Sequence, residues 1–271
     1  MGFAFIWLFP LFWTLWNSLR PYSEVLRRGL FSWPNTWTLN NYFEAFQKMS
    51  VVRYFLNTVI ILVPSVTFIL FFASMTAFVL TKYKIPFERS ILALFLAGSL
   101  LPAQVIYYPV FKMYLMVGDI FGNRNMFYDN YSGVILLHIA MQTGFATLVL
   151  HSNLRSIPKD YSEAAMVDGA TVMQHYFRVI LPMLKAPLAS LGILLTTLIY
   201  NDFVVSWSLL KTDRHFPITT SLSRVGAFSL VIPDHNVLAA GSVLVALPLL
   251  IFYFILRRHF NSGVSFAFTN K

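Results

Sequence analysis

The polar residues best placed for chemistry lie between two long apolar runs, in the stretch Tyr161–Pro182. Its first part is good helix-forming sequence, with Ser162 as the expected N-cap and the Glu163 carboxylate favoured near a helix N-terminus. Gly169 is expected to end this short helix, because glycine adopts the left-handed conformation at low cost. A second helical piece is expected over 172–180, before the proline that closes the stretch. A short helix with a carboxylate near its start suits docking into a groove on a soluble partner. An ordinary connector between two membrane spans is the alternative.

A second candidate group surrounds Asp202, a carboxylate inside an apolar segment. Acids inside membrane spans cost at least ~2.5 kcal/mol on insertion scales and normally face the protein interior or a wet cavity. Amides and carboxylates pair with sugar hydroxyls, and an aromatic face stacks on a sugar ring. Asn201, Asp202 and Trp207 are therefore candidates for a polar and aromatic surface that suits a sugar. The alternative is that Asp202 makes a hydrogen bond that fixes helix packing.

The remaining groups form no catalytic or metal-binding set. The six histidines have no metal-ligand spacing, and His138, the only one well inside an apolar segment, is expected to make a packing hydrogen bond. Gln104 and Gln142 are expected to do the same. A P-loop is absent, so the chain cannot bind ATP in that manner. Without cysteine, disulfides, thiolate metal sites and cysteine catalysis are excluded. We predict no catalytic residue, metal or cofactor on this chain.

Composition identifies an integral membrane protein. The 271 residues are 57% hydrophobic and 11% charged, whereas soluble domains carry about 25% charged residues. The net charge of +9 comes from cations scattered among loops, with no basic stripe of the kind that binds nucleic acid. Anionic lipid headgroups are the ordinary partners of such cations.

Six segments are apolar enough to cross a bilayer, which takes about 20 residues each. These are 3–19, 54–80, 90–110, 132–151, 186–210 and 237–256. Residues 21–53, 111–131 and 211–236 form connectors on one side, and 81–89, 152–185 and 257–271 lie on the other. The first segment lacks the basic start and the cleavage site of a signal peptide. We predict an all-α membrane protein of about six transmembrane helices, with one membrane domain over 1–271.

The stretch Tyr161–Pro182 is similar to the EAA loop of the membrane-spanning permease subunit of an ATP-binding-cassette (ABC) importer. In that family E-A-A is followed by three residues, glycine, nine residues, isoleucine, one residue and Leu-Pro. Glu163 and Gly169 fall in register, as does Leu181–Pro182, and Val179 stands where isoleucine is usual. The match covers about twenty residues with both spacings kept, whereas a bare E-A-A would carry no weight.

Residues 200–203, Tyr-Asn-Asp-Phe, resemble the W-N-D-F segment in the fifth helix of carbohydrate-importer permeases, with Tyr200 in place of tryptophan. This resemblance implies that Asn201, Asp202 and Trp207 lie along the translocation path. In some sugar-importer permeases the C-terminal tail reaches the ATPases. The usual glycine-rich ending is not reproduced here, and 261–265 is the nearest stretch. The family resemblance is therefore concentrated in 161–182 and, to a lesser degree, in 200–207.

The resemblance implies a type I ABC importer permease fold, similar to the second permease of maltose-type systems, in a bacterial-type plasma (inner) membrane. The implied partners are a second permease, two ATPase subunits that carry ATP and Mg²⁺, an extracytoplasmic solute-binding protein and membrane lipid. The loop 152–185 would face the cytoplasm. The residues expected to couple this chain to an ATPase are Ser162, Glu163, Ala164, Ala165, Asp168 and Gly169. The function implied is a translocation path for a sugar or related solute.

Two other functions remain open from the residues alone. A stand-alone secondary carrier would usually show more intramembrane charge and a duplication of spans. A non-transporting membrane scaffold is the other. Lysine and arginine divide evenly between the two sets of loops, so the positive-inside rule does not settle the orientation.

Overall fold

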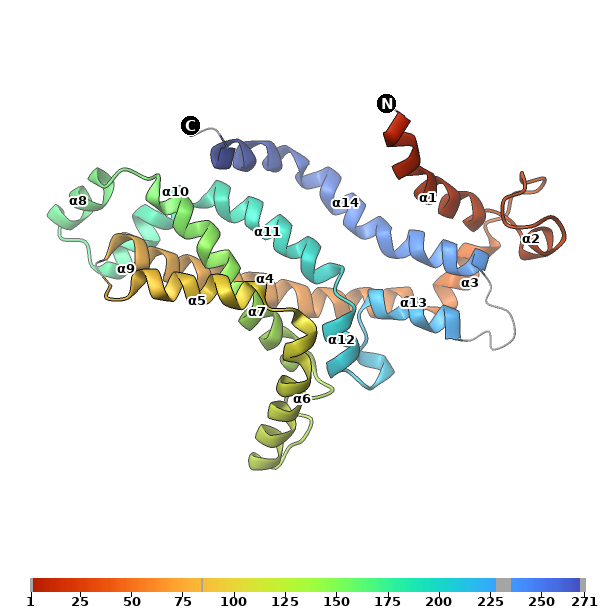
Figure 1. Ribbon diagram of the computed structural model, residues 1–271, viewed down its shortest axis with the longest axis horizontal. Coiled ribbons are helices and arrows are strands. Elements are labelled where there is room, and N and C mark those ends of the chain that lie inside the picture. Colours follow the sequence, from red (N-terminus) through yellow and green to blue (C-terminus); the bar gives the residue numbers. More distant parts are fainter. Residues whose placement is uncertain (1, 84, 228–234, 269–271) are drawn as a thin grey trace. The chain divides into compact units, whose positions relative to one another are not determined.

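The structure is a computed structural model that describes residues 2–83, 85–227 and 235–268. Over these residues the regular elements are helices, and no strand occurs among them (Figure 1). The prediction of an all-α protein is confirmed.

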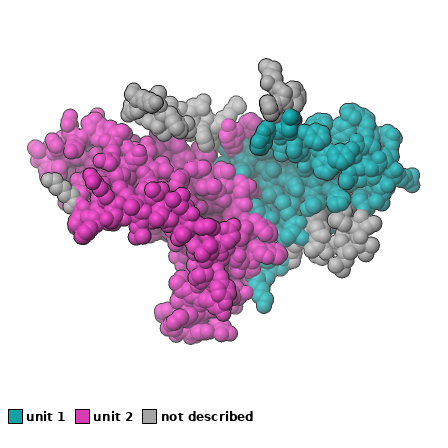
Figure 2. Space-filling view, in the orientation of Figure 1, with its two compact units in different colours: residues 1–59, 211–252 teal, residues 60–210, 253–271 magenta. Residues whose placement is uncertain are grey.

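The chain divides into two compact units (Figure 2). Unit 1 comprises residues 1–59 and 211–252, and unit 2 comprises residues 60–210 and 253–271. Two of the three boundaries fall inside the long helices α4 (Val51–Lys82) and α14 (His235–Phe268), and the third, at 210/211, falls in a connection between helices. The single membrane domain expected over the whole chain stays a prediction.

Unit 1 joins the first part of the chain to a late part. Its elements are α1 (Gly2–Ser18), α2 (Tyr22–Arg28), α3 (Asn40–Lys48), the short 3-10 turn η2 (Asp213–His215), α13 (Ile218–Ala227) and the first parts of α4 (Val51–Lys82) and α14 (His235–Phe268). The Asn57 side chain, on α4, donates hydrogen bonds to the carbonyls of Arg214 and Phe216 at 2.8 and 2.9 Å. This pair of bonds fixes the turn before α13 against α4.

Two side-chain amides from distant helices cap the C-terminal end of α1. Asn41 Nδ2 donates to the carbonyls of Ser18 and Arg20, at 2.8 and 2.7 Å. Asn236 Nδ2 donates to the carbonyls of Asn17 and Arg20, at 2.8 and 2.9 Å. The last carbonyls of a helix have no partner within it, and buried backbone groups without a partner are costly. The two asparagines therefore satisfy the end of α1; we call this arrangement the α1 cap.

Unit 2 contains the remaining elements. They are α5 (Glu88–Leu100), α6 (Ala103–Ile120), α7 (Tyr131–Arg155), α8 (Asp160–Val167), α9 (Val172–Gln174), the π-helical turn η1 (His175–Ile180), α10 (Leu181–Met183), α11 (Lys185–Tyr200) and α12 (Val204–Leu209). The helices α5 and α7 pack against each other. A Cβ added at Gly144 of α7 would lie 3.4 Å from Cβ of Phe95 on α5, which shows how closely the two backbones approach.

Three helices in the described residues are long and apolar enough to cross a membrane: α4, α7 and the part of α14 over His235–Ile255. Two further pairs of helices, each bent at a short break, are also long and apolar enough if each pair is counted as one span. The first joins α5 to Gln104–Ile120 with a bend of 99°, and the second joins Val172–Met183 to α11 with a bend of 73°. The helix α1 has 17 residues. Several transmembrane helices are thus confirmed, and the count of six stays a prediction.

The predicted span 90–110 is wrong as a single helix. The chain breaks at Pro102, between α5 and α6, because proline lacks an amide hydrogen and does not fit a helix interior. The helix α6 then runs on to Ile120, so the first half of the connector predicted over 111–131 is helical.

The predicted span 186–210 also needs correction. The helix α11 stops at Tyr200, and the separate α12 begins at Val204. In the tail, the backbone of α14 remains helical to Phe268. A contact between residues 261–265 and an ATPase would involve side chains that lie outside the described part of the structure.

Candidate functional site

The helix predicted at the start of the Tyr161–Pro182 loop exists as α8, in unit 2 (Figure 1). It begins at Asp160 with Lys159 as its N-cap residue, so the prediction that Ser162 is the N-cap is wrong. Ser162 instead lies within the first turn and faces inward, with 6% of its surface exposed. The acidic residues of the first turn are Asp160 and Glu163, as a helix N-terminus favours.

Gly169 ends α8, as predicted. Its φ is +73°, the left-handed region that glycine adopts without a Cβ penalty. The amide of Gly169 donates to the Met166 carbonyl at 3.1 Å, and the amide of Ala170 donates to the Ala165 carbonyl at 3.0 Å. This pair of bonds is a Schellman motif, which satisfies the last carbonyls of the helix and turns the chain sharply away.

The six predicted coupling residues divide between two faces of the loop. Ser162 and Ala165 are buried, whereas Glu163, Ala164, Asp168 and Gly169 are exposed. The structure thus brings the Glu163 and Asp168 carboxylates to the outer surface. It places the other helix face against the rest of unit 2.

A buried hydrogen bond joins α8 to the turn that follows it. Ser162 Oγ and His175 Nε2 are 3.1 Å apart, and both residues are buried. His175 opens η1, a π-helical turn in a region where the sequence predicts an ordinary helix. Such wide turns are rare and are often found at functional sites. The sequence analysis missed this link, because a spacing of 13 residues between a serine and a histidine has no meaning without the fold.

The π-helical segment η1 packs against α4. The Phe78 ring lies edge-on to His175, with ring centroids 5.1 Å apart, and is tilted against Tyr176 at 5.3 Å. The hydroxyls of Ser74 and Tyr176 form a buried hydrogen bond of 2.7 Å. A continuous set of contacts therefore runs from α8 through η1 to the part of α4 that lies in unit 2.

We expect Ser162→Ala and His175→Leu to loosen α8 to a similar extent, because each removes one end of the same bond. A hydrogen bond contributes about 1 kcal/mol, so amide hydrogen exchange over 162–167 should rise about fivefold in the purified protein. The double variant should exchange no faster than the more affected single variant. His175→Gln keeps a donor and should remain close to wild type. Additive increases in the double variant would mean that the two side chains act separately.

The predicted path residues lie where α11 gives way to α12. Both carboxylate oxygens of Asp202 accept backbone hydrogen bonds, from the amides of Val205 and Ser206, each at 3.3 Å. Asp202 therefore acts as a cap for α12. Its Oδ2 also lies 3.8 Å from Nε2 of His138, a buried residue of α7. These contacts give a physical basis to the alternative role of Asp202, in which it fixes helix packing, and the path role stays a prediction.

The neighbours of Asp202 are more exposed. The Asn201 amide donates to the Thr197 carbonyl at 2.9 Å, and the residue is exposed. The Trp207 ring stacks on Phe203 with centroids 5.4 Å apart and an angle of 19° between the rings, and 51% of its surface is exposed. Of the three predicted path residues, Trp207 is the one with an aromatic ring, and it is partly exposed.

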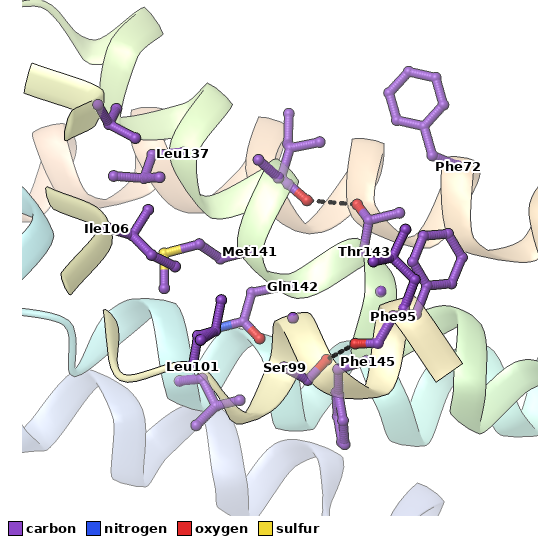
Figure 3. Close-up of a pocket in the computed structure, with 17 residues that line it drawn as sticks. Phe72, Phe95, Ser99, Leu101, Ile106, Leu137, Met141, Gln142, Thr143 and Phe145 are labelled. Atoms are coloured by element: carbon purple, nitrogen blue, oxygen red, sulfur yellow. Dashed lines mark hydrogen bonds between the residues drawn. The ribbon is translucent and has the colours of Figure 1, made fainter. Parts of the chain in front are cut away.

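A cavity of about 840 Å³ lies elsewhere in unit 2, between α5, α6 and α7 (Figure 3). Its walls are mostly apolar and include the rings of Phe72 and Phe95. The hydroxyls of Ser99 and Thr143 are bonded to carbonyls of their own helices, at 2.8 and 2.6 Å. Gln142, expected from the sequence to serve packing, brings its amide to this cavity (Figure 3). Asn201, Asp202 and Trp207 do not line it.

The structure resembles a chain in the crystal structure of a bacterial ABC transporter involved in the import of the acidic polysaccharide alginate. The TM-score is 0.79 at 21% identity, over 95% of this chain and 92% of the other. At 21% identity, this similarity is evidence for the fold alone.

The model of the family described as binding-protein-dependent transport system inner membrane component matches residues 42–266, and this chain belongs to that family. It is 28% identical to the diacetylchitobiose uptake system permease protein NgcG of Streptomyces coelicolor, over 94% of this chain and 82% of the relative. It is also 28% identical to the arabinooligosaccharides transport system permease protein AraQ of Bacillus subtilis, over 98% and 91%. The chain is therefore a transport subunit that spans the membrane. Neither the secondary carrier nor the scaffold is favoured.

Proposed function

We propose that this subunit forms a translocation path for a sugar or related solute and couples to a separate ATPase through the loop Tyr161–Pro182. The observation that carries the proposal is the construction of α8. The helix is short, ends on Gly169, shows Glu163 and Asp168 to the outside, and is anchored from the inside by Ser162. An element that is exposed yet held by buried contacts can transmit a displacement without unfolding.

The outer surface of this loop indicates what its partner must offer. Tyr161, Met166 and Val167 are exposed at 53%, 56% and 87%. Exposed apolar side chains of this size mark interaction sites, and the two carboxylates beside them favour a partner with positive charge. A groove with an apolar floor and a basic rim on the ATPase fits both features. ATP and Mg²⁺ would bind to that partner, and the loop 152–185 would face the cytoplasm.

A sugar is the proposed solute class. The permeases of Streptomyces coelicolor and Bacillus subtilis are named for diacetylchitobiose and arabinooligosaccharides. The cavity beside α5 and α7 supports the same class, because Phe72 and Phe95 offer ring faces and Gln142 offers an amide. Trp207 adds a ring at the α11–α12 break, where Asp202 holds the backbone and Asn201 is exposed.

The proposed assembly contains a second permease, two ATPase subunits and an extracytoplasmic solute-binding protein in a bacterial inner membrane. Closure of the ATPase pair on ATP would draw the docked α8 helices together. The motion would pass from α8 through His175 and Phe78 to α4 and open the path to the other side. No bond is made or broken on this chain.

Affinity purification from native membranes in a mild detergent tests this proposal. We expect a P-loop ATPase, a second permease and a solute-binding protein to accompany the chain, with nucleotide hydrolysis in the purified complex. Mass spectrometry identifies the subunits, and screening the binding protein against sugars identifies the solute class. Recovery of the chain without an ATPase under several mild conditions would contradict the proposed coupling.

A further inference from the structure

A second cavity in unit 2, of about 380 Å³, lies where α4 and α7 end and α8 begins. Three cationic side chains line it: Lys82 from the last turn of α4, Arg155 from the last residue of α7, and Lys159 from the start of α8. We call it the α4–α7–α8 crevice. The Glu163 and Met166 side chains of α8 form part of its wall.

Two acids, Glu88 and Glu163, share the crevice with the three cations, so one positive charge is left over. Glu88 lies in the crevice, but its Oε1 is engaged by Nε2 of His151 at 3.1 Å. Lys82 Nζ donates to the Ile157 carbonyl at 3.3 Å, a neutral group. In the part of the chain that the structure describes, no acid lies within 4.0 Å of the charged groups of Lys82, Arg155 or Lys159.

The position of the crevice along the helices indicates where a neutralising group would come from. Both α4 and α7 are long and apolar enough to cross a membrane, and they end at Lys82 and Arg155. If the hydrocarbon ends near the last turns of these two helices, the cations stand at the level of the lipid headgroups. Basic pockets between membrane helices at that level recognise the phosphate of anionic lipids.

We propose that the α4–α7–α8 crevice binds the phosphate of an anionic phospholipid headgroup. Lys82 and Lys159 would donate to the phosphate oxygens, and Arg155 would add a planar pair of donors. The acyl chains would lie along α4 and α7. A lipid held there would also touch Met166 in the wall formed by α8, with its phosphate on the side of the cations, and so would brace α8.

Native mass spectrometry of the delipidated protein, with any subunits that accompany it, tests this site. Phosphatidylglycerol and phosphatidylcholine are titrated separately onto wild type and onto the Lys82→Gln/Lys159→Gln variant. Loss of two headgroup cations should weaken phosphatidylglycerol binding about 25-fold. The control Lys112→Gln removes an exposed lysine of α6 that lies over the Tyr108 ring, and it should bind as wild type. Unchanged phosphatidylcholine binding by the double variant shows that it is folded.

Two results would overturn the proposal. Equal phosphatidylglycerol affinity in wild type and the double variant would mean that the crevice holds no headgroup. Inorganic phosphate that binds as tightly as the lipid and displaces it would identify a site for a free anion. If the double variant fails to fold, Arg155→Gln replaces it, with a smaller expected loss of about fivefold.

Discussion

Replacing Gly133 by alanine is expected to destabilise the protein more than any other small substitution in unit 2. A Cβ at this position would collide with the Phe127 carbonyl oxygen, and it would lie 2.8 Å from the Phe127 carbonyl carbon and 3.0 Å from Cε2 of Tyr114. Two of these atoms belong to backbone, which cannot rotate away as a side chain can. The Gly133 carbonyl also accepts a 2.9 Å hydrogen bond from the Tyr114 hydroxyl, which holds α6 against α7.

The segment that Gly133 touches has little freedom to shift. The Ser132 hydroxyl donates to the Met126 carbonyl at 2.8 Å, and the Asp129 amide donates to the Leu209 carbonyl at 2.9 Å. Overpacking of this kind costs about 3 kcal/mol, which should lower the midpoint of thermal unfolding by roughly 6–12 °C. Size-exclusion chromatography after heating in detergent measures that midpoint.

Gly144→Ala is the matched control for this prediction, because it makes the same change in the same helix. A Cβ at Gly144 would meet Phe95 at 3.4 Å, close to ordinary contact. We expect its midpoint to stay within a few degrees of wild type. Equal midpoints for the two variants would mean that the close approach at Gly133 does not limit stability.

Glu163→Ala is expected to lower solute uptake per ATP hydrolysed by about tenfold or more, provided that α8 docks on an ATPase as proposed. The carboxylate is exposed, so its loss leaves the buried contacts of α8 intact. Charge-assisted hydrogen bonds contribute about 1.5–3 kcal/mol, which is enough to uncouple hydrolysis from transport. Uptake and hydrolysis are measured together in proteoliposomes that contain the purified complex.

Glu44→Ala provides the control for the Glu163 variant. Glu44 is a partly exposed glutamate of α3 that pairs with Lys48 at 2.9 Å, and surface pairs contribute little to stability. The ratio of uptake to hydrolysis should equal that of wild type. If Glu163→Ala also keeps the wild-type ratio at normal subunit levels, Glu163 has no part in coupling.

The sequence predicted those features of the fold that local chemistry decides. Gly169 ends α8 because only the left-handed conformation closes that turn, and the family spacing marks the position. The apolar lengths of α4 and α7 identify them as spans without reference to any neighbour. By contrast, α6 continues past the predicted end because residues such as Lys112 and Asp119 interrupt an apolar segment without interrupting a helix.

The parts of the site that escaped prediction depend on which way a side chain faces. Ser162 is a good N-cap by type, but the packing of α8 on η1 turns its hydroxyl inward to His175. Asp202 could be assigned to an interior position, yet its role as a cap for α12 requires the break that follows Tyr200. Gln142 could not be assigned to a cavity until α5 and α7 were placed together. Tertiary contacts decide each of these cases.

The α1 cap sets an order for the assembly of unit 1 during synthesis. Asn41 is made soon after α1 and can satisfy the Ser18 carbonyl early, but Asn236 follows Asn17 by 219 positions. Until the ribosome has passed that point, the Asn17 carbonyl accepts only the local hydrogen bond from the Arg20 amide, at 3.2 Å, and closing so long a loop carries an entropic cost. The first helix of the chain is thus among the last to reach its final packing, and a nascent chain stalled before α14 presents an unfinished helix end to the machinery that removes defective membrane proteins.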